Sequence, residues 1–273
     1  MRAVITLTTD FGLADPYVAA MKGVILAINP DAAIVDVTHN VRPQRILQAA
    51  FVTQVAWPFF PDGAVHVAVV DPGVGTTRGA LCLETPRGRF AGPDNGVLSA
   101  ALPDGARPPA GEGPSQIPVP EGCRVFSITN PRYLREPVSA TFHGRDVFAP
   151  AAAHLSLGVP ANELGDAVAT MLALPQLRAR RRADGALEGR VLHIDRFGNV
   201  VTDARTDDAP EGPIAVELVG EVVYGPVRTY ADATGLVALA GSSGYIEVAL
   251  PNDSASAQLG IEIGDRVIVR ARG

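Results

Sequence analysis

Short apolar stretches alternate with helix-like patterns through the first half of the chain, and this alternation constrains the fold more than any other feature. Three strands and two intervening helices are expected at 4–8, 16–28, 33–38, 44–55 and 64–70. Repeats of strand, helix and strand build a mainly parallel sheet with helices packed on it. The nearly unbroken apolar runs at 34–37 and 65–70 further predict strands that are buried on both faces.

The pattern changes after residue 170. Residues 171–186 contain a proline and four arginines between 178 and 182, and short strands with Gly, Pro and Asp turns follow. We therefore predict an α/β N-terminal domain at 1–170, a linker at 171–186 and a small β-barrel-like domain at 187–273. Within the first domain, residues 104–121 are rich in Pro and Gly, which predicts a surface loop.

Composition and charge exclude several classes of protein. The chain has 273 residues, 47% of them hydrophobic, and a net charge of −6, so it is globular and no nucleic-acid partner is expected. The first apolar run reaches Thr9 and Asp10 at once, which is too short for a signal peptide or a membrane span. We expect a cytoplasmic protein with no membrane partner. Cys82 and Cys123 lack the spacing of a zinc site, and no metal is expected.

Acidic side chains follow two of the predicted strands at the point where each ends. Asp10 follows the first strand and Asp71 follows the third. Open α/β sheets bind ligands at this edge, and an Asp there is well placed to accept both hydroxyls of a ribose, which favours a functional Asp10. Asp15, closer to the next helix, is equally well explained as its N-cap. The glycines here form neither a dinucleotide-binding motif nor a phosphate-binding loop.

The turn after the third strand places an acid near a base. Residues 69–78 have the sequence VVDPGVGTTR, and such a turn can bring Asp71 and Arg78 together. An ion pair that braces a tight loop explains the two residues about as well as a functional role does. A second polar cluster, TFHGRD at 141–146, precedes a predicted helix. Helix capping would explain Asp146 there but not His143, which is accessible to a ligand.

Two turns of the C-terminal domain carry polar side chains. The sequence DRFGN at 195–199 combines an acid, an aromatic ring and an amide, which suit a cationic amine and the face and edge of a base. The alternative is a β-turn held by Asp195 with Phe197 in the core. The turn that contains Ser242 and Ser243 offers hydroxyl and amide groups that suit a carboxylate.

Together these segments resemble the S-adenosyl-L-methionine hydroxide adenosyltransferases, which are hydrolase relatives of the fluorinase and chlorinase. The resemblance covers nearly the whole chain, in order, through TDFG (9–12), DPYV (15–18), MKG (21–23), DPGVG (71–75), GPDNG (92–96), TFHGRD (141–146), DRFGN (195–199) and SSGY (242–245). It implies cleavage of S-adenosyl-L-methionine by water at the ribose C5′, which gives adenosine and L-methionine. The small molecule is then the substrate, and no cofactor is implied.

The resemblance also implies roles for individual residues. Asp71, Arg78 and His143 match the set that activates water. The implied substrate contacts are Asp10 on the ribose hydroxyls, Asp195, Ser242 and Ser243 on the methionine end, and Phe197 and Asn199 on the adenine. Further substrate-binding positions are implied at Asp15, Tyr17, Gly144, Leu250 and Asn252. The family forms trimers, so a homotrimer with sites at subunit interfaces is implied as well.

Two alternatives to hydrolysis stay open at this point. Halogenases of the same superfamily carry Tyr where this chain has Asp71 and Ser where it has Gly144, and the Asp71 carboxylate would repel a halide. A non-catalytic adenosine- or S-adenosyl-L-methionine-binding protein is the second alternative. Such a protein could lack the water-activating set, and all three of its residues are present here.

Overall fold

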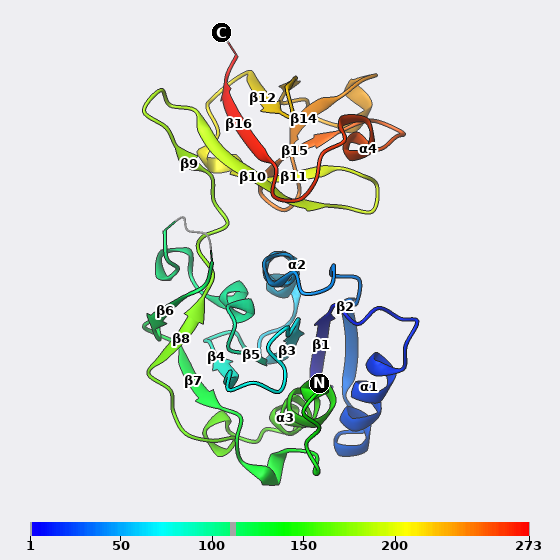
Figure 1. Cartoon of the computed structure of the whole chain (residues 1–273), viewed down its shortest axis with the longest axis vertical. Helices are drawn as coiled ribbons and strands as arrows, with labels where there is room; N and C mark the ends of the chain where they lie inside the picture. Colours follow the sequence, from blue (N-terminus) through cyan, green and yellow to red (C-terminus); the bar gives the residue numbers. More distant parts are fainter. Residues whose placement is uncertain (1, 110–112, 273) are drawn as a thin grey trace. The chain divides into compact units, whose positions relative to one another are not determined.

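A six-stranded mixed sheet forms the centre of the N-terminal part of the chain (Figure 1). The computed structural model describes residues 2–109 and 113–272. The strands follow the order β2-β1-β3-β5-β4-β7 and span β1 (Val4–Thr9), β2 (Ala33–Thr38), β3 (Ala64–Val69), β4 (Ala80–Glu84), β5 (Gly88–Pro93) and β7 (Arg124–Ser127). The first four in this order are parallel, whereas β4 and β7 run antiparallel at one edge. The predicted α/β class is confirmed, with a mixed sheet.

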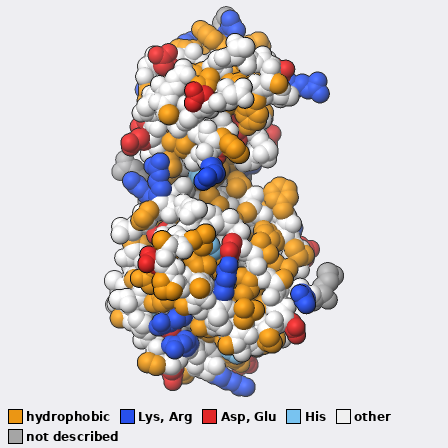
Figure 2. Space-filling model, turned by 90° about the vertical axis from the view of Figure 1, so that its right-hand side faces the viewer, with side chains coloured by type: hydrophobic (Ala, Val, Ile, Leu, Met, Phe, Trp, Pro, Cys, Tyr) orange, Lys and Arg blue, Asp and Glu red, His pale blue; other side chains and the backbone are white. Residues whose placement is uncertain are grey.

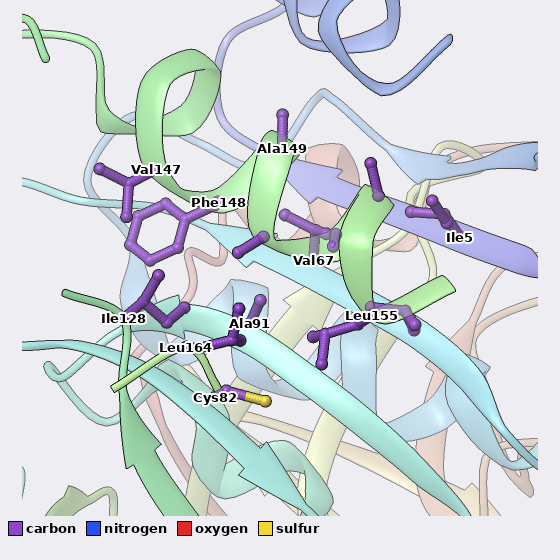
Figure 3. Close-up of a cluster of buried hydrophobic side chains, with 14 of the residues drawn as sticks. Ile5, Val67, Cys82, Ala91, Ile128, Val147, Phe148, Ala149, Leu155 and Leu164 are labelled. Carbon is purple, nitrogen blue, oxygen red and sulfur yellow. The ribbon is translucent and has the colours of Figure 1, made fainter. Parts of the chain in front are cut away.

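Helices cover both faces of this sheet because its central strands bury alternate residues on opposite sides. The helices are α1 (Tyr17–Ile28), α2 (Ile46–Ala56) and α3 (Ala149–Ser156). Ile5 and Val67 belong to the core with α1 and α3, whereas Ala68 belongs to the core with α2. Figure 3 shows Phe148 and Leu155 packed in the first of these cores.

The strands and helices expected in the first 70 residues are confirmed to within about two residues at each end. The burial expected for residues 34–37 is wrong. Strand β2 pairs only with β1 in the described part of the chain, and Val35 is 38% exposed. Strand β3 lies inside the sheet and is buried along its whole length. An apolar run therefore predicts a strand here without predicting whether that strand is central.

A two-stranded sheet lies in the segment for which we expect a loop. Strand β6 (Ser115–Pro118) pairs antiparallel with β8 (Thr170–Ala173), and residues 110–112 of the same segment lie outside the described residues. The contacts divide the chain into two units, Met1–Gln176 and Leu177–Gly273. The stretch expected as a linker therefore contains most of β8 and also β9 (Arg180–Arg181), while the domain limits themselves stay a prediction.

An eight-stranded antiparallel sheet forms the C-terminal unit and closes nearly into a barrel. Its strands beyond β9 are β10 (Leu187–Ile194), β11 (Val200–Arg205), β12 (Ile214–Leu218), β13 (Glu221–Gly225), β14 (Val237–Ala240), β15 (Tyr245–Ala249) and β16 (Arg266–Ala271). One short helix, α4 (Ala255–Leu259), follows β15. The core inside this sheet contains Val191, Val216 and Val248, which are fully buried. The β-barrel-like prediction is confirmed.

Short helical turns connect these elements. They span Trp57–Phe59, Val97–Ala101, Asp104–Ala106, Pro131–Tyr133, Ala161–Glu163, Thr206–Asp208 and Tyr230–Asp232, with a π-helical turn at Gly144–Phe148. The π-helical turn runs directly into α3, and Pro150 lies in the first turn of α3. Among the described residues, no helix has both the length and the apolar character needed to span a membrane.

Candidate active site

A pocket of about 410 Å³ opens at the carboxyl ends of β1 and β3. Strands β1 and β3 are neighbours in the sheet. The chain continues from β1 to β2 on one side and from β3 to β4 and β5 on the other, and open α/β sheets bind ligands where the connections diverge in this way. Four segments line the pocket: the end of β1 with the turn that follows it, the end of β3 with the turn that follows it, the loop before α2, and residues 141–144. The lining residues are Asp10, Phe11, Tyr17, Pro43, Gln44, Val69, Asp71, Pro72, Val74, Thr141, Phe142, His143 and Gly144.

The guanidinium of Arg78 joins Asp71 to His143. Its Nε donates to Asp71 Oδ1 and Oδ2 at 3.0 and 3.1 Å, and its Nη2 donates to Asp71 Oδ2 and to His143 Nδ1, the latter at 2.7 Å. The Arg78 and Asp71 side chains are only 11% and 6% exposed. The ring of Phe148 lies 5.5 Å from the guanidinium carbon. Removing one partner of a pair this buried costs about 3–5 kcal/mol.

The contact with Arg78 fixes the protonation of His143. A guanidinium has only donors, so His143 Nδ1 accepts, and the neutral ring carries its proton on Nε2. Burial, followed by the positive charge of Arg78, lowers the pKa of His143 against the opposing pull of Asp71 and Asp146. His143 is therefore a neutral hydrogen-bond donor at its Nε2 atom.

Glycine and a threonine hydroxyl shape the turn between Asp71 and Arg78. Thr76 Oγ1 donates to the carbonyl of Gly73 at 2.7 Å and accepts from the Arg78 N–H at 3.3 Å. Gly75 has a φ of +78°, and a Cβ atom there would lie 2.4 Å from the carbonyl oxygen of Ala140. The turn and the segment before His143 are thus in direct backbone contact.

The segment GPDNG supports this turn from β5. Asn95 Nδ2 donates to the carbonyl of Val70 at 2.9 Å, just before Asp71, and the N–H of Asp94 donates to the carbonyl of Gly79 at 2.9 Å. Backbone groups on either side of the turn are therefore held by Asn95 and Asp94, which lie 25 and 15 positions further along the chain.

Asp146 anchors the segment that carries His143. Its carboxylate is fully buried and accepts from Arg145 at 2.7 and 2.8 Å and from the N–H of Ser139 at 2.9 Å, with Arg135 at 3.3 Å. Burial alone would raise the pKa of Asp146, but these hydrogen bonds and charges outweigh it, and the pKa lies below its ordinary value. A charged Asp146 thus fixes the backbone from 135 to 146.

Three aromatic rings form one wall of the pocket. The centroids of Phe11, Tyr17 and Phe142 lie 5.2–5.9 Å apart in tilted and edge-to-face arrangements. Gly144 lies behind this wall, where a Cβ atom would come within 3.2 Å of both Phe11 and the sulfur of Met21. The absence of a side chain at 144 therefore sets the position of the wall.

Asp10 projects from the end of β1 onto the same pocket. Its Oδ2 accepts the backbone N–H of Gln44 at 2.8 Å, which joins the end of β1 to the loop before α2. Gln44 has a φ of +66°, an unusual value for a residue other than glycine. One carboxylate oxygen of Asp10 is thus used to hold the loop.

A second pocket, of about 710 Å³, lies in the C-terminal unit. It is lined by Asp195, Phe197, Asn199, Tyr230, Leu250, Pro251, Asn252, Asp253 and Ser254. Asp195 Oδ1 accepts the N–H groups of Phe197 and Asn199, both at 2.9 Å, and Asp195 Oδ2 accepts Asn199 Nδ2 at 2.9 Å. Asp195 therefore forms the expected β-turn. Phe197 is 77% exposed, so its alternative as a core residue is wrong.

No group of three or more His, Cys, Asp or Glu side chains in the described ranges, 2–109 and 113–272, is arranged to hold a metal ion. The carboxylates that line the two pockets instead accept hydrogen bonds from arginine, from backbone N–H groups or from a side-chain amide.

Family models and relatives of known sequence match the chain along most of its length. The N-terminal domain model of the SAM hydroxide adenosyltransferases matches residues 5–165, and the corresponding C-terminal domain model matches residues 189–268. The chain belongs to this family. It is 42% identical to an (R)-S-adenosyl-L-methionine hydrolase of Thermus thermophilus, over 97% of this chain and 98% of that protein. A Salinispora tropica protein of the same name is 39% identical over 98% and 97%.

A solved structure is also similar to the chain. The crystal structure of an uncharacterized conserved protein from Thermotoga maritima matches with a TM-score of 0.84 at 31% identity, over 97% of this chain and all of that chain.

Most of the predicted SAM hydroxide adenosyltransferase residues line one of the two pockets. Asp10, Tyr17, Asp71, His143 and Gly144 line the first, with Arg78 bonded behind Asp71 and His143. Asp195, Phe197, Asn199, Leu250 and Asn252 line the second.

Besides Arg78, three predicted residues line neither pocket. Asp15 is exposed, and the expectation that it caps α1 is wrong because the N-cap is Pro16 with no side-chain hydrogen bond. Ser242 is exposed, and the side chain of Ser243 lies near the buried carboxylate of Glu247. Glu247 in turn contacts the hydroxyl of Tyr230 at 3.4 Å, which relates this turn to the second pocket.

Several lining residues were not predicted. Phe11 and Phe142 lie within segments that carry the family resemblance, but a single aromatic residue in a turn does not distinguish a pocket wall from the core. Gln44 and Tyr230 lie outside those segments, and no pattern in the sequence marks them.

Gly75→Ala is expected to disrupt the first pocket, and Gly63→Ala provides a matched control. Both glycines have positive φ, +78° and +84°, so each variant pays about 1–2 kcal/mol for that conformation. Only at Gly75 would the new Cβ meet Ala140, whereas no atom lies within 4 Å at Gly63. We expect about 100-fold lower kcat/KM for S-adenosyl-L-methionine in Gly75→Ala alone. Equal kcat/KM in the two variants would contradict this account of the turn.

Proposed function

We propose that this chain hydrolyses S-adenosyl-L-methionine to adenosine and L-methionine, by attack of water at the ribose C5′. The observation that carries the proposal is the Arg78 guanidinium bonded to both Asp71 and His143 at the wall of a pocket of ligand size. The names of the relatives add the sulfur stereochemistry: we take the (R) epimer as the substrate.

The reaction needs help only at the nucleophile. The water oxygen forms a bond to C5′ while the C5′–S bond breaks, and its electron pair stays on sulfur, so methionine leaves as a neutral thioether. No acid is required at the leaving group. The attacking water loses a proton, and a base within hydrogen-bond reach of the water accelerates this step.

Asp71 is the proton acceptor in this proposal. His143 has no acceptor available, because its Nδ1 lone pair faces Arg78 and its Nε2 carries the proton. The Asp71 carboxylate accepts from Arg78 and still has lone pairs for a water molecule. His143 Nε2–H then orients the water by donating to its oxygen, and Arg78 holds both groups in place.

The remaining residues hold the substrate in the proposed arrangement. Asp10 accepts the ribose hydroxyls through the oxygen that does not bind Gln44. Asp195 with Ser242 and Ser243 holds the methionine end, and Phe197 stacks on the adenine while Asn199 bonds its edge. The high exposure of Phe197 supports its availability for a ligand or a second subunit.

The two pockets lie on separate units, and we propose that a homotrimer completes the site. In that assembly the first pocket of one subunit faces the second pocket of its neighbour, and closure between subunits excludes bulk water from the sulfonium. Each pocket alone carries only part of the proposed substrate contacts.

Neither alternative function fits the first pocket as well. A halide would face the Asp71 carboxylate, and the Arg78 donors that point toward that carboxylate and His143 are already used. A non-catalytic binding protein would have no need for a buried Asp–Arg–His set beside its ligand.

The protein is further proposed to act without a cofactor, in the cytoplasm, and without a nucleic-acid partner. Acidic and basic side chains are interspersed on the face shown in Figure 2, with no single basic stripe across it. The net charge of −6 agrees with this distribution.

Hydrolysis in ¹⁸O-labelled water tests the reaction directly. With each pure sulfur epimer as substrate, mass spectrometry of the products from a single turnover should find the label in adenosine and none in methionine. The (R) epimer should be consumed and the (S) epimer left. A sample without protein corrects for spontaneous breakdown. Unlabelled adenosine would contradict water attack at C5′, and consumption of the (S) epimer alone would contradict only the stereochemistry.

Asp71→Asn should lower kcat by about 10²–10⁴-fold with little change in KM, because the amide keeps the size of the carboxylate but is not a base. Asp10→Ala should instead raise KM. These variants are cleaner than Arg78→Ala, which leaves the buried Asp71 unpaired. Asp62→Asn is the matched control, since Asp62 pairs with Arg87 on the exposed surface and should behave as the wild type. A raised KM with unchanged kcat in Asp71→Asn would make Asp71 a substrate ligand.

Mixed assemblies test the shared site. Asp10→Ala and Asn199→Ala chains, each weakly active alone at low substrate, are coexpressed so that trimers contain both. If each site combines two subunits, about a quarter of the sites regain two intact halves and activity reappears. A site built within one chain would regain none. Sedimentation of the wild type should give the mass of a trimer, and a fully active monomer would contradict the assembly.

A further inference from the structure

A series of polar contacts begins beside Asp10, at Thr9, and runs from the buried interior to the surface. Thr9 Oγ1 lies 2.8 Å from His39 Nδ1, His39 Nε2 lies 3.0 Å from Asp36 Oδ1, and Asp36 Oδ2 accepts from Lys22 Nζ at 2.6 Å. It joins the end of β1 to β2 and α1. Thr9 is fully buried and His39 is 3% exposed, so the contact between them is shielded from water, whereas the Asp36 and Lys22 side chains are 37% and 33% exposed.

The same histidine also holds the backbone around Asp10. The carbonyl of His39 accepts the N–H of Gly12 at 2.8 Å, and Thr9 Oγ1, which the imidazole contacts, accepts the N–H of Phe11 at 3.2 Å. His39 also begins the loop between β2 and α2. Five residues later in this loop, the N–H of Gln44 donates to the Asp10 carboxylate. Thr9, Phe11 and Gly12, which lie within two residues of Asp10, are thus all bonded to His39 or to the hydroxyl that its ring contacts.

The groups around His39 determine which of its ring nitrogens carries the proton and which way the Thr9 hydroxyl donates. Burial alone would raise the pKa of Asp36, but the hydrogen bonds and charges of Lys22 and His39 lower it below its ordinary value, so Asp36 is a carboxylate at neutral pH. A carboxylate beside Nε2 favours a proton on that nitrogen and leaves Nδ1 to accept from the Thr9 hydroxyl. The Thr9 oxygen is then oriented to accept from Phe11.

We propose that His39 is a positioning residue, which fixes the turn 9–12 so that Asp10 and Phe11 face the substrate. This inference rests on the proposed function, because it takes Asp10 as the ribose ligand. His39 touches no substrate itself. It acts through Thr9 and through its own carbonyl group.

The chain contains a matched control for this geometry. His66 Nδ1 lies 2.8 Å from Thr6 Oγ1 on the same strand β1, and His66 is also 3% exposed. Thr6 lies three residues before Thr9, further from the end of β1, and His66 packs among Trp57, Phe60 and Phe90. Loss of either pair costs a buried hydrogen bond, but only the His39 pair adjoins Asp10.

Three variants separate positioning from simple stability. His39→Gln places an amide near the Nε2 position and loses the contact with Thr9, whereas His39→Asn places an amide near Nδ1 and keeps it. Thr9→Val removes the hydroxyl. We expect His39→Gln and Thr9→Val to raise KM and the dissociation constant of adenosine about 10-fold, with kcat within about threefold, and His39→Asn to restore most of the loss. His66→Gln should lower the melting temperature and leave KM unchanged.

Amide hydrogen exchange supplies a readout that does not depend on turnover. Exchange at Phe11 and Gly12 should accelerate in His39→Gln and stay slow in His66→Gln. Unchanged KM, adenosine binding and exchange in His39→Gln, with only a lower melting temperature, would overturn the positioning role. A wild-type protein that releases no adenosine would contradict the proposed function instead, and the exchange rates would still decide the role of His39.

Discussion

The geometry of the first pocket depends on one shared cation. Arg78 donates to Asp71, seven residues earlier, and to His143, 65 residues later, so it fastens the turn after β3 to the segment before α3. Neither Asp71 nor His143 alone would be suited to bind a water molecule in a site that excludes solvent. The carboxylate needs a counter-charge to be buried, and the imidazole needs a fixed tautomer to donate in one direction. A single guanidinium meets both needs. The Phe148 ring lies 5.5 Å from its carbon, and the Thr76 hydroxyl accepts the backbone N–H of the same arginine.

The mixed sheet explains why this cation finds its partners. The ends of β1 and β3 bring Asp10 and Asp71 to one edge, while α3 packs across the same strands and brings the segment before it to that edge. Two further polar systems, the Asp146 cluster and the contacts of His39, hold the flanking segments. The pocket is therefore formed by loops, but each loop is tied to a helix or strand within a few residues.

The sequence predicts the sheet edge better than it predicts the walls of the pocket. Short apolar runs that alternate with helix-like patterns predict β1 and β3, and the sequence shows directly which acids follow these strands. These patterns do not report which neighbour a segment meets. For that reason the exposed edge position of β2, the antiparallel strands β4 and β7 and the lining residues Gln44 and Phe142 emerge only from the folded chain. His143 is predicted only from its accessible place beside a glycine and from the family resemblance. Its contact with Arg78 spans 65 positions, and no local pattern connects residues that far apart.

The missing side chain at Gly144 has a consequence for the packing around the pocket. The family resemblance implies serine at this position in the halogenases, and a Cβ atom here would come within 3.2 Å of Phe11 and of Met21. Phe11 belongs to the aromatic wall, and Met21 packs in the core beneath α1. A side chain at residue 144 would therefore displace the Phe11 ring or the Met21 side chain by a few tenths of an ångström, so the size of this residue couples the shape of the pocket to the packing of the core.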